Sequence, residues 1–181
     1  LAISLRPLRQ VVWSIVGAHA EAEDADRAEV FKLTERFLNI GGVIMDDFFK
    51  TPEAGTTVPA FTLEELHALR QQLTVGARKL DLWVVLYAHQ LTDDVVPHLD
   101  LCDVVTFWTW RAEDLPKLED NFLKLERLLP AKRRVLGCYM WDFGSSRPMP
   151  LDSMKHQCEM GRAWLRAGRI DGMIFLASPI C

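Results

Sequence analysis

Gly41-Gly42-Val43-Ile44-Met45-Asp46-Asp47-Phe48-Phe49 carries the clearest indication of fold class in this sequence. A short apolar run that opens with two glycines and ends in two carboxylates is typical of a buried parallel strand. In a parallel α/β fold the carboxyl ends of the strands form the ligand-binding face. Because buried strands rarely tolerate carboxylates, we expect Asp46 and Asp47 at the rim of a site. The alternative is structural: one Asp caps the following loop and the other faces solvent.

Five further apolar runs alternate with helical patterns along the chain. They predict strands at 11–17, 82–87, 103–110, 134–141 and 171–177. Apolar residues at helical spacing lie between the strands, and Thr62-Leu63-Glu64-Glu65 fits a capping box at the start of one helix. Strands that alternate with helices predict a parallel α/β sheet.

Two architectures fit this alternation, a (β/α)8 TIM barrel and an open doubly wound parallel sheet. A whole barrel needs about 250 residues, and this chain has 181. No Gly-x-Gly-x-x-Gly or P-loop follows any strand, so the usual nucleotide-binding motifs are absent from the sequence. We expect one domain over 1–181 with an incomplete TIM-barrel-like fold that comprises βα units three to eight. Its first and last strands would each lack a neighbouring strand on one side. The open doubly wound sheet is the alternative.

Composition excludes several classes of protein. The chain is 49% hydrophobic and 25% charged, with a net charge of -4 and scattered basic residues, so we expect no nucleic-acid partner. No apolar run approaches the roughly 18 residues of a membrane span, and no signal peptide is visible. The four cysteines are far apart and form no metal-ligand pair, so we expect no metal and no cofactor. The start at Leu1 indicates a removed leader or, as we expect, a longer chain whose remainder is missing. The sequence does not indicate in which cellular compartment the protein resides.

Aromatic and ionisable residues collect where the predicted strands end. Both tyrosines and three of the six tryptophans fall there. Aromatic rings beside carboxylates and imidazoles suit stacking against a sugar ring, with hydrogen bonds to its hydroxyls. The alternative is that large aromatic side chains plug the top of the sheet. The set is His19, Asp46, Asp47, Tyr87, His89, Trp108, Trp110, Tyr139, Trp141 and Asp142.

This layout resembles the TIM-barrel glycoside hydrolases. In the chitinase-like family the fourth strand carries Asp-Gly-x-Asp-x-Asp-x-Glu, and the segment 42–48 resembles the middle of that run, with Asp46 at the last Asp. Phe48 stands where that family has its catalytic Glu, and Ile44 where it has an upstream Asp. The large retaining glycosidase clan places its acid after strand four and its nucleophile at strand seven, commonly as Glu. Those places hold Asp46-Asp47 and Asp142 here.

The resemblance implies a carbohydrate-active hydrolase. Glycosidic cleavage uses two carboxyl groups, one a proton donor and the other a nucleophile or base. We assign the acid to Asp46 or Asp47 and the second carboxylate to Asp142. The sugar platform would comprise Tyr87, Trp108, Trp110, Tyr139 and Trp141, while His19 and His89 would bond hydroxyls or tune a carboxyl pKa.

Two other functions stay open at this point. The first is a metal-dependent hydrolase, because His19, His89 and the three carboxylates are metal-ligand types. The second is a non-catalytic glycan-binding barrel, in which the carboxylates accept hydrogen bonds from hydroxyls without turnover.

Overall fold

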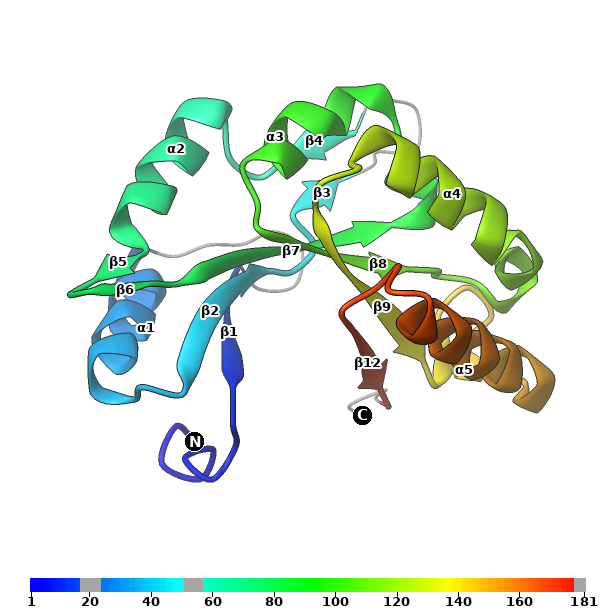
Figure 1. Cartoon of the computed structure of the whole chain (residues 1–181), viewed down its shortest axis with the longest axis horizontal. Coiled ribbons are helices and arrows are strands. Elements are labelled where there is room, and N and C mark those ends of the chain that lie inside the picture. The colour runs from blue at the N-terminus through cyan, green and yellow to red at the C-terminus, as the bar shows by residue number, and fades with distance from the viewer. Residues whose placement is uncertain (17–23, 51–56, 178–181) are drawn as a thin grey trace. The chain divides into compact units, whose positions relative to one another are not determined.

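The computed structural model describes residues 1–16, 24–50 and 57–177. Six strands form the main sheet in the order β1-β2-β7-β8-β9-β12 (Figure 1). This confirms the mixed α/β class and the six strands at their predicted places. The three strand pairs with a defined register, β1–β2, β2–β7 and β9–β12, are parallel. The strands are β1 Val11–Val16, β2 Ile40–Met45, β7 Asp81–Tyr87, β8 Val104–Trp108, β9 Arg133–Tyr139 and β12 Gly172–Leu176.

The strand order distinguishes the two architectures expected from the sequence. Apart from short hairpins, each strand lies next to the strand that precedes it along the chain. A doubly wound sheet reverses its order at a switch point, where the ligand binds. The six strands described here show no such reversal. Their order is the one expected of an incomplete barrel.

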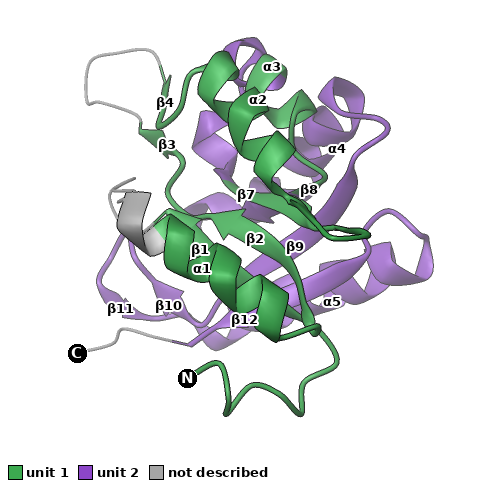
Figure 2. Ribbon diagram, turned by 90° about the vertical axis from the view of Figure 1, so that its left-hand side faces the viewer, with its two compact units in different colours: residues 1–85, 97–104 green, residues 86–96, 105–181 purple. Residues whose placement is uncertain are grey.

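The chain divides into two compact units. Unit 1 comprises Leu1–Val85 and Pro97–Val104, and unit 2 comprises Leu86–Val96 and Val105–Cys181 (Figure 2). In the described part of the chain, no helix is both long enough and apolar enough to cross a membrane. The expectation of one domain over 1–181 stays a prediction.

Unit 1 carries the helices α1 (Asp24–Arg36) and α2 (Leu63–Gln72) and most of α3 (Val96–Asp100). The predicted capping box is confirmed: the Glu65 N–H donates to Thr62 Oγ1 at 3.2 Å, and the Thr62 N–H donates to the Glu65 carboxylate at 2.8 Å. The core is apolar and closed to solvent, which holds β2 and β7 in place. Its fully buried side chains include Val43, Met45, Leu66, Leu82 and Leu99.

Two short hairpins in unit 1 were not predicted. The segment that leaves the Asp46-Asp47 strand pairs with itself as β3 (Phe49–Lys50) and β4 (Val58–Pro59), and residues 51–56 lie outside the described residues. After α2, β5 (Thr74–Val75) pairs with β6 (Arg78–Lys79). Gly76 makes this turn with φ 61°, a backbone conformation that favours glycine.

Unit 2 carries the helices α4 (Leu118–Leu128) and α5 (Leu151–Arg166), with the 3-10 segments η2 (Ala88–Gln90), η3 (Asp93–Val95) and η4 (Ala112–Lys117). Phe122 of α4 stacks on Trp164 of α5, with ring centroids 4.0 Å apart. Arg169 forms ion pairs with Glu119 and Glu126 of α4, at 2.8 Å and 2.6 Å. These contacts hold α4 in place. They also position η4, which connects β8 to α4.

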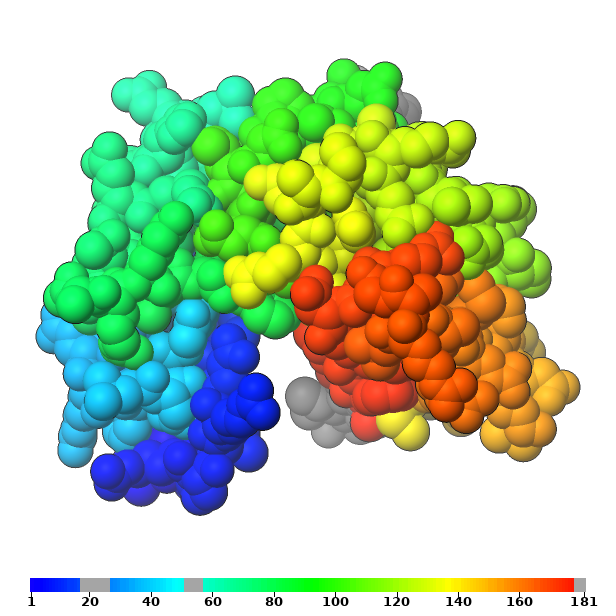
Figure 3. All heavy atoms as spheres, in the orientation of Figure 1, coloured from blue at the N-terminus to red at the C-terminus, as the bar shows by residue number. Residues whose placement is uncertain are grey.

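The last strand of unit 2, β12, exposes apolar side chains to solvent. Phe175 and Leu176 of β12 are 52% and 39% exposed, and the red C-terminal segment lies at the surface beside the orange helix α5 (Figure 3). In the strand order β12 and β1 are the outermost strands, as the sequence predicted. Gly168 follows the end of α5 with φ 68°, a left-handed conformation that commonly ends a helix.

Candidate functional site

The two carboxylates of unit 1 form a tight turn at the carboxyl end of β2. The Asp47 N–H donates to Asp46 Oδ1 at 2.9 Å. Asp47 has φ 45°, so a residue other than glycine occupies the left-handed region. This turn directs the chain from β2 into the buried Phe48, which is 0% exposed.

The surroundings of Asp46 favour its protonated form. Desolvation by the surrounding protein raises the pKa of the Asp46 carboxyl, and the charge of Asp47 raises it further. The hydrogen bond from the Asp47 N–H opposes these two effects without cancelling them. A carboxyl that keeps its proton to higher pH is suited to general acid chemistry.

The aromatic residues of unit 2 form one connected cluster, which we call the aromatic cluster. Trp110 lies at its centre, with ring centroids 5.3 Å from Tyr87, 6.3 Å from Tyr139 and 5.1 Å from Phe143. Edge-to-face and tilted contacts of this kind are favourable, so the rings hold one another in place. The members are Tyr87, His89, Trp108, Trp110, Tyr139 and Phe143.

Trp108 supports the cluster from inside the protein. It is 5% exposed, and its indole N–H donates to Thr106 Oγ1 at 2.9 Å. The ring lies flat against Gly137 of β9, where an added Cβ would come within 1.9 Å of Trp108 Cδ2. The glycine thus makes room for the indole, which in turn contacts Tyr139 at 4.7 Å between centroids.

Tyr87 and Tyr139 join β7 to β9 within the cluster. Their hydroxyl oxygens are 3.5 Å apart, with Tyr139 as donor. Both side chains are buried, at 7% and 4% exposure, whereas Trp110 is half-buried and His89 is exposed. The part of the cluster that meets solvent is therefore formed by His89 and Trp110.

The surroundings of His89 favour its neutral imidazole form. Desolvation lowers its pKa, the charge of Arg111 lowers it further, and Asp114 opposes the change. Its ring stacks on Tyr87 with the planes 4° apart. A neutral imidazole both donates and accepts hydrogen bonds, as binding to a hydroxyl requires.

Asp142 is a buried carboxylate in a network of hydrogen bonds. It lies in β10 (Trp141–Asp142), which pairs with β11 (Arg147–Pro148), and it is 1% exposed. It accepts from the Ala112 N–H at 3.3 Å and from Arg147 Nε at 3.4 Å. Burial alone would raise the pKa of Asp142, but these bonds and those from Ser145 outweigh it and hold the pKa below 3.8.

A cavity of about 190 Å³ lies where β7 and β8 end, and we call it the β8 pocket. His89 and Trp110 of the aromatic cluster contribute to its wall. Polar side chains supply much of the rest: Thr109 after β8, Asp114 and Lys117 from η4, and Asn121 from α4. Aromatic faces beside a few convergent polar groups are typical of ligand sites.

The sequence carries a signal for this pocket in the spacing of three polar residues. Asp114, Lys117 and Asn121 are spaced i, i+3 and i+7, which places them on one side of a helical segment. Phe143 and Thr109 were also missed, because each follows a predicted site residue and carried no pattern of its own.

The structure brings together five of the predicted residues, namely Tyr87, His89, Trp108, Trp110 and Tyr139. Trp141 is half-buried in β10 next to Asp142. Asp46 and Asp47 belong to unit 1 and Asp142 to unit 2. His19 lies outside the described residues. The catalytic and binding roles assigned to all of these residues stay predictions.

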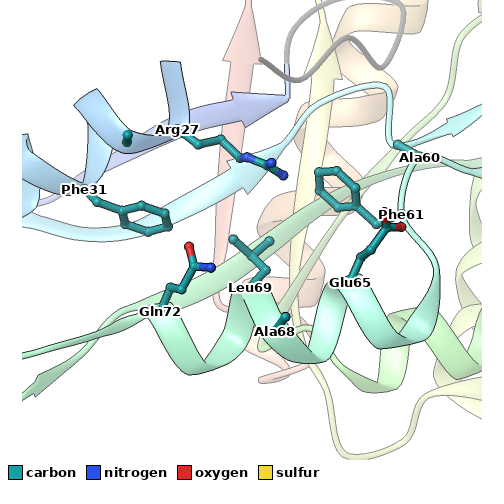
Figure 4. A pocket seen from close by; sticks show the side chains of 9 residues that line it. Arg27, Phe31, Ala60, Phe61, Glu65, Ala68, Leu69 and Gln72 are labelled. Carbon is teal, nitrogen blue, oxygen red and sulfur yellow. The ribbon is translucent and has the colours of Figure 1, made fainter. Parts of the chain in front are cut away.

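Unit 1 has a larger cavity, of about 620 Å³, between α1 and α2. Figure 4 shows Phe31 on the α1 side of the cavity, Leu69 on the α2 side, and Arg27 pointing toward Phe61. The guanidinium carbon of Arg27 lies 5.2 Å from the centre of the Phe61 ring, a cation–π contact. Glu65 lies in the same wall, with its carboxylate engaged in the capping box. The two charged groups thus already have partners within the protein.

Metal-binding geometry is absent from the described residues: no group of three His, Cys, Asp or Glu side chains is arranged to hold an ion. The metal-dependent alternative therefore has no ligand set in residues 1–16, 24–50 and 57–177.

Comparison with solved structures gives distant likenesses, and one of them is to a glycoside hydrolase domain. No protein-family model and no curated protein matches the sequence. Among solved structures, the PgaB (BpsB) glycoside hydrolase domain from Bordetella bronchiseptica is similar, at 14% sequence identity and a TM-score of 0.47. The match covers 92% of this chain and 64% of that domain, so the chain spans about two thirds of its neighbour's length.

Proposed function

We propose that this chain belongs to a carbohydrate-active hydrolase that cleaves glycosidic bonds. The observation that carries the proposal is the aromatic cluster of unit 2, where rings from the ends of three strands contact one another. The cluster presents Trp110 and His89 beside a pocket lined by a carboxylate, an amine, an amide and a hydroxyl. Sugar recognition uses this combination, because a pyranose has apolar ring faces and a rim of hydroxyls.

The catalytic part of the proposal rests on three carboxyl groups. Asp46, with a raised pKa, suits the proton donor, and Asp47 adjoins it. Asp142, with a lowered pKa, is ionised and suits the second role. Carboxyl groups whose surroundings shift their pKa values in opposite directions are a recurring feature of glycosidase pairs. A glycan-binding protein without turnover is the second candidate, because the aromatic cluster alone accounts for binding.

A glycan-array screen of the purified chain, followed by a reducing-sugar assay on the hits, tests the proposal. We expect binding and turnover. Asp46→Asn or Asp47→Asn, and also Asp142→Asn, should cut turnover by about 10² or more, since general acid–base catalysis contributes at least this much. Affinity without turnover would favour the binding protein. Asp152→Asn is the control, because that carboxylate is 99% exposed on α5.

Three results would contradict parts of the proposal. Absence of any glycan hit would remove the carbohydrate assignment. Full turnover in all three Asn variants would remove the carboxylates from catalysis. Zinc or manganese in the purified protein, found by elemental analysis in stoichiometric amount, would instead favour the metal-dependent hydrolase.

A further inference from the structure

We propose that the β8 pocket is a subsite for one sugar ring, which it holds through a pair of neighbouring free hydroxyls. The inference rests on the proposed carbohydrate function and adds a ligand class and four residues to it. These residues are Thr109, Asp114, Lys117 and Asn121.

Thr109 gives the first observation. Its side chain is 1% exposed, and its Oγ1 has no hydrogen-bond partner among the described residues. A buried hydroxyl without a partner is costly, and most buried polar groups in proteins are satisfied. Because Thr109 lines the pocket, a ligand hydroxyl is a natural partner for it.

The other three side chains supply complementary chemistry. Within the described residues, the side chains of Asp114, Lys117 and Asn121 make no hydrogen bond to the protein. Asp114 accepts hydrogen bonds, Lys117 donates them and Asn121 does both. Each hydroxyl of a vicinal diol donates one hydrogen bond and accepts others. A carboxylate beside an amine and an amide therefore matches two adjacent hydroxyls.

The charges of the pocket balance one another and favour a ligand without net charge. Asp114 would repel an anion, and Lys117 would repel a cation. The groups that act electrostatically on His89 in the wall of the pocket are Arg111 and Asp114, again one of each sign. A neutral diol uses both charged groups at once, which neither an anion nor a cation does.

The size and walls of the pocket limit the ligand to one ring. Its volume of about 190 Å³ is below the roughly 300–1,000 Å³ of sites for drug-sized molecules. Trp110 offers an aromatic surface that is already fixed by its edge contact with Tyr87, at 86° between the ring planes. When a sugar ring stacks on Trp110, little conformational entropy is lost, because the indole is already ordered.

Titration of the ¹⁵N-labelled chain with methyl glycosides tests the subsite by NMR. The probes are methyl α-D-glucopyranoside, methyl α-D-galactopyranoside and methyl α-D-mannopyranoside. The matched control is methyl 2,3-dideoxy-α-D-glucopyranoside, which keeps the ring and two hydroxyls but has no vicinal pair. We expect at least one full glycoside to shift the Thr109 and Asn121 amides and the Trp110 indole N–H saturably. The dideoxy compound should bind at least about tenfold more weakly, the loss expected when buried polar groups go unpaired.

Two variants separate binding from folding. Thr109→Val keeps the shape and removes the hydroxyl, so binding should fall about tenfold while the unfolding temperature stays the same or rises, because an unsatisfied buried group is gone. Asp114→Asn should weaken binding similarly and provides a second test if Thr109→Val fails to fold. Asp120→Asn is the control, since this exposed carboxylate lies on α4 and outside the pocket lining.

The outcomes distinguish the subsite from the wider function. Equal affinity for the dideoxy compound, or wild-type affinity in both Thr109→Val and Asp114→Asn, overturns the subsite. Glycan turnover without any binding of the three glycosides also overturns it, and leaves the proposed hydrolase standing. Binding of a glycoside at Thr109 and Asn121 in a chain without turnover supports the subsite and removes the hydrolase.

Discussion

The rings of Tyr87 and His89 stack in parallel, with centroids 5.6 Å apart and planes inclined by 4°. Tyr87 ends β7 and His89 lies in the 3-10 segment η2 that follows. The Tyr87 N–H donates to Gln90 Oε1 at 3.1 Å, which ties this segment back to the strand. The stack thus fixes the imidazole plane at the edge of the β8 pocket.

This position predicts the pH dependence of His89. Desolvation and Arg111 lower its pKa below 6.5, so protonation favours the unfolded chain. The stability linked to neutral His89 is present above pH 6.5 and is lost as the pH falls through the folded-state pKa. NMR titration of the imidazole should give this lowered pKa. His89→Phe should make the unfolding temperature less dependent on pH in that range, and an unchanged pH dependence in this variant would contradict the assignment.

Asp142 is expected to stabilise the fold whatever its catalytic role. Asp142→Leu would leave the Ala112 N–H without its acceptor and should cost about 1–3 kcal/mol in the free energy of unfolding. Asp142→Asn keeps an acceptor oxygen and should cost less. Urea unfolding of both variants checks this ranking. Because the pKa of Asp142 is lowered, its contribution is present above pH 3.8 and is lost as the pH falls through the folded-state value.

Gly137→Ala should disturb the aromatic cluster through Trp108. The added Cβ would lie 1.9 Å from Trp108 Cδ2, so the indole must move, at about 1–3 kcal/mol for overpacking. Gly172→Ala on the adjacent strand β12 is a matched control, since its Cβ would meet Val135 at an ordinary 3.9 Å. Near-UV circular dichroism and thermal unfolding should separate the two variants. The same unfolding temperature in both would rule out the close packing of Trp108 on Gly137.

The capping box of α2 gives a further stability test. Thr62→Ala removes the acceptor of the Glu65 N–H and should cost about 1 kcal/mol. Thr92→Ala is the control: Thr92 also precedes a helical segment, but its side chain makes no capping hydrogen bond. Chemical unfolding measures both. A similar loss in the two variants would mean that the Thr62 cap contributes nothing specific.

The strands were predictable because each is an apolar run bounded by turn residues, and β2 with its two glycines is the plainest case. The capping box gave the start of α2 for the same reason, since both partners lie within four residues. The hairpin β5–β6 could not be found in this way. Each of its strands has two residues, too few to show an alternating pattern.

The site was less predictable than the fold. The aromatic residues were found because they end strands, and the burial of Tyr87, Trp108 and Tyr139 agrees with the alternative in which large aromatic side chains plug the top of the sheet. Trp108 and Tyr139 lie inside the protein, because Gly137 leaves space there for the indole. The β8 pocket depends on how η4 and α4 return toward β8, which a linear sequence records only as helical spacing. A buried hydroxyl such as that of Thr109 leaves no trace in a sequence pattern.

The left-handed backbone of Asp47 has a consequence for protein engineering. Glycine is the residue that such a φ favours, and Asp47→Gly should relieve strain on the order of 1 kcal/mol. The same change deletes one of the two charges beside the β2 strand end and with it the influence of Asp47 on its neighbour. Selection of a library for heat tolerance alone would therefore enrich Gly at this position. Selection of the same library for turnover of a glycan hit would keep Asp if the carboxylate takes part. Comparing the two libraries would therefore show whether position 47 is kept for stability or for turnover.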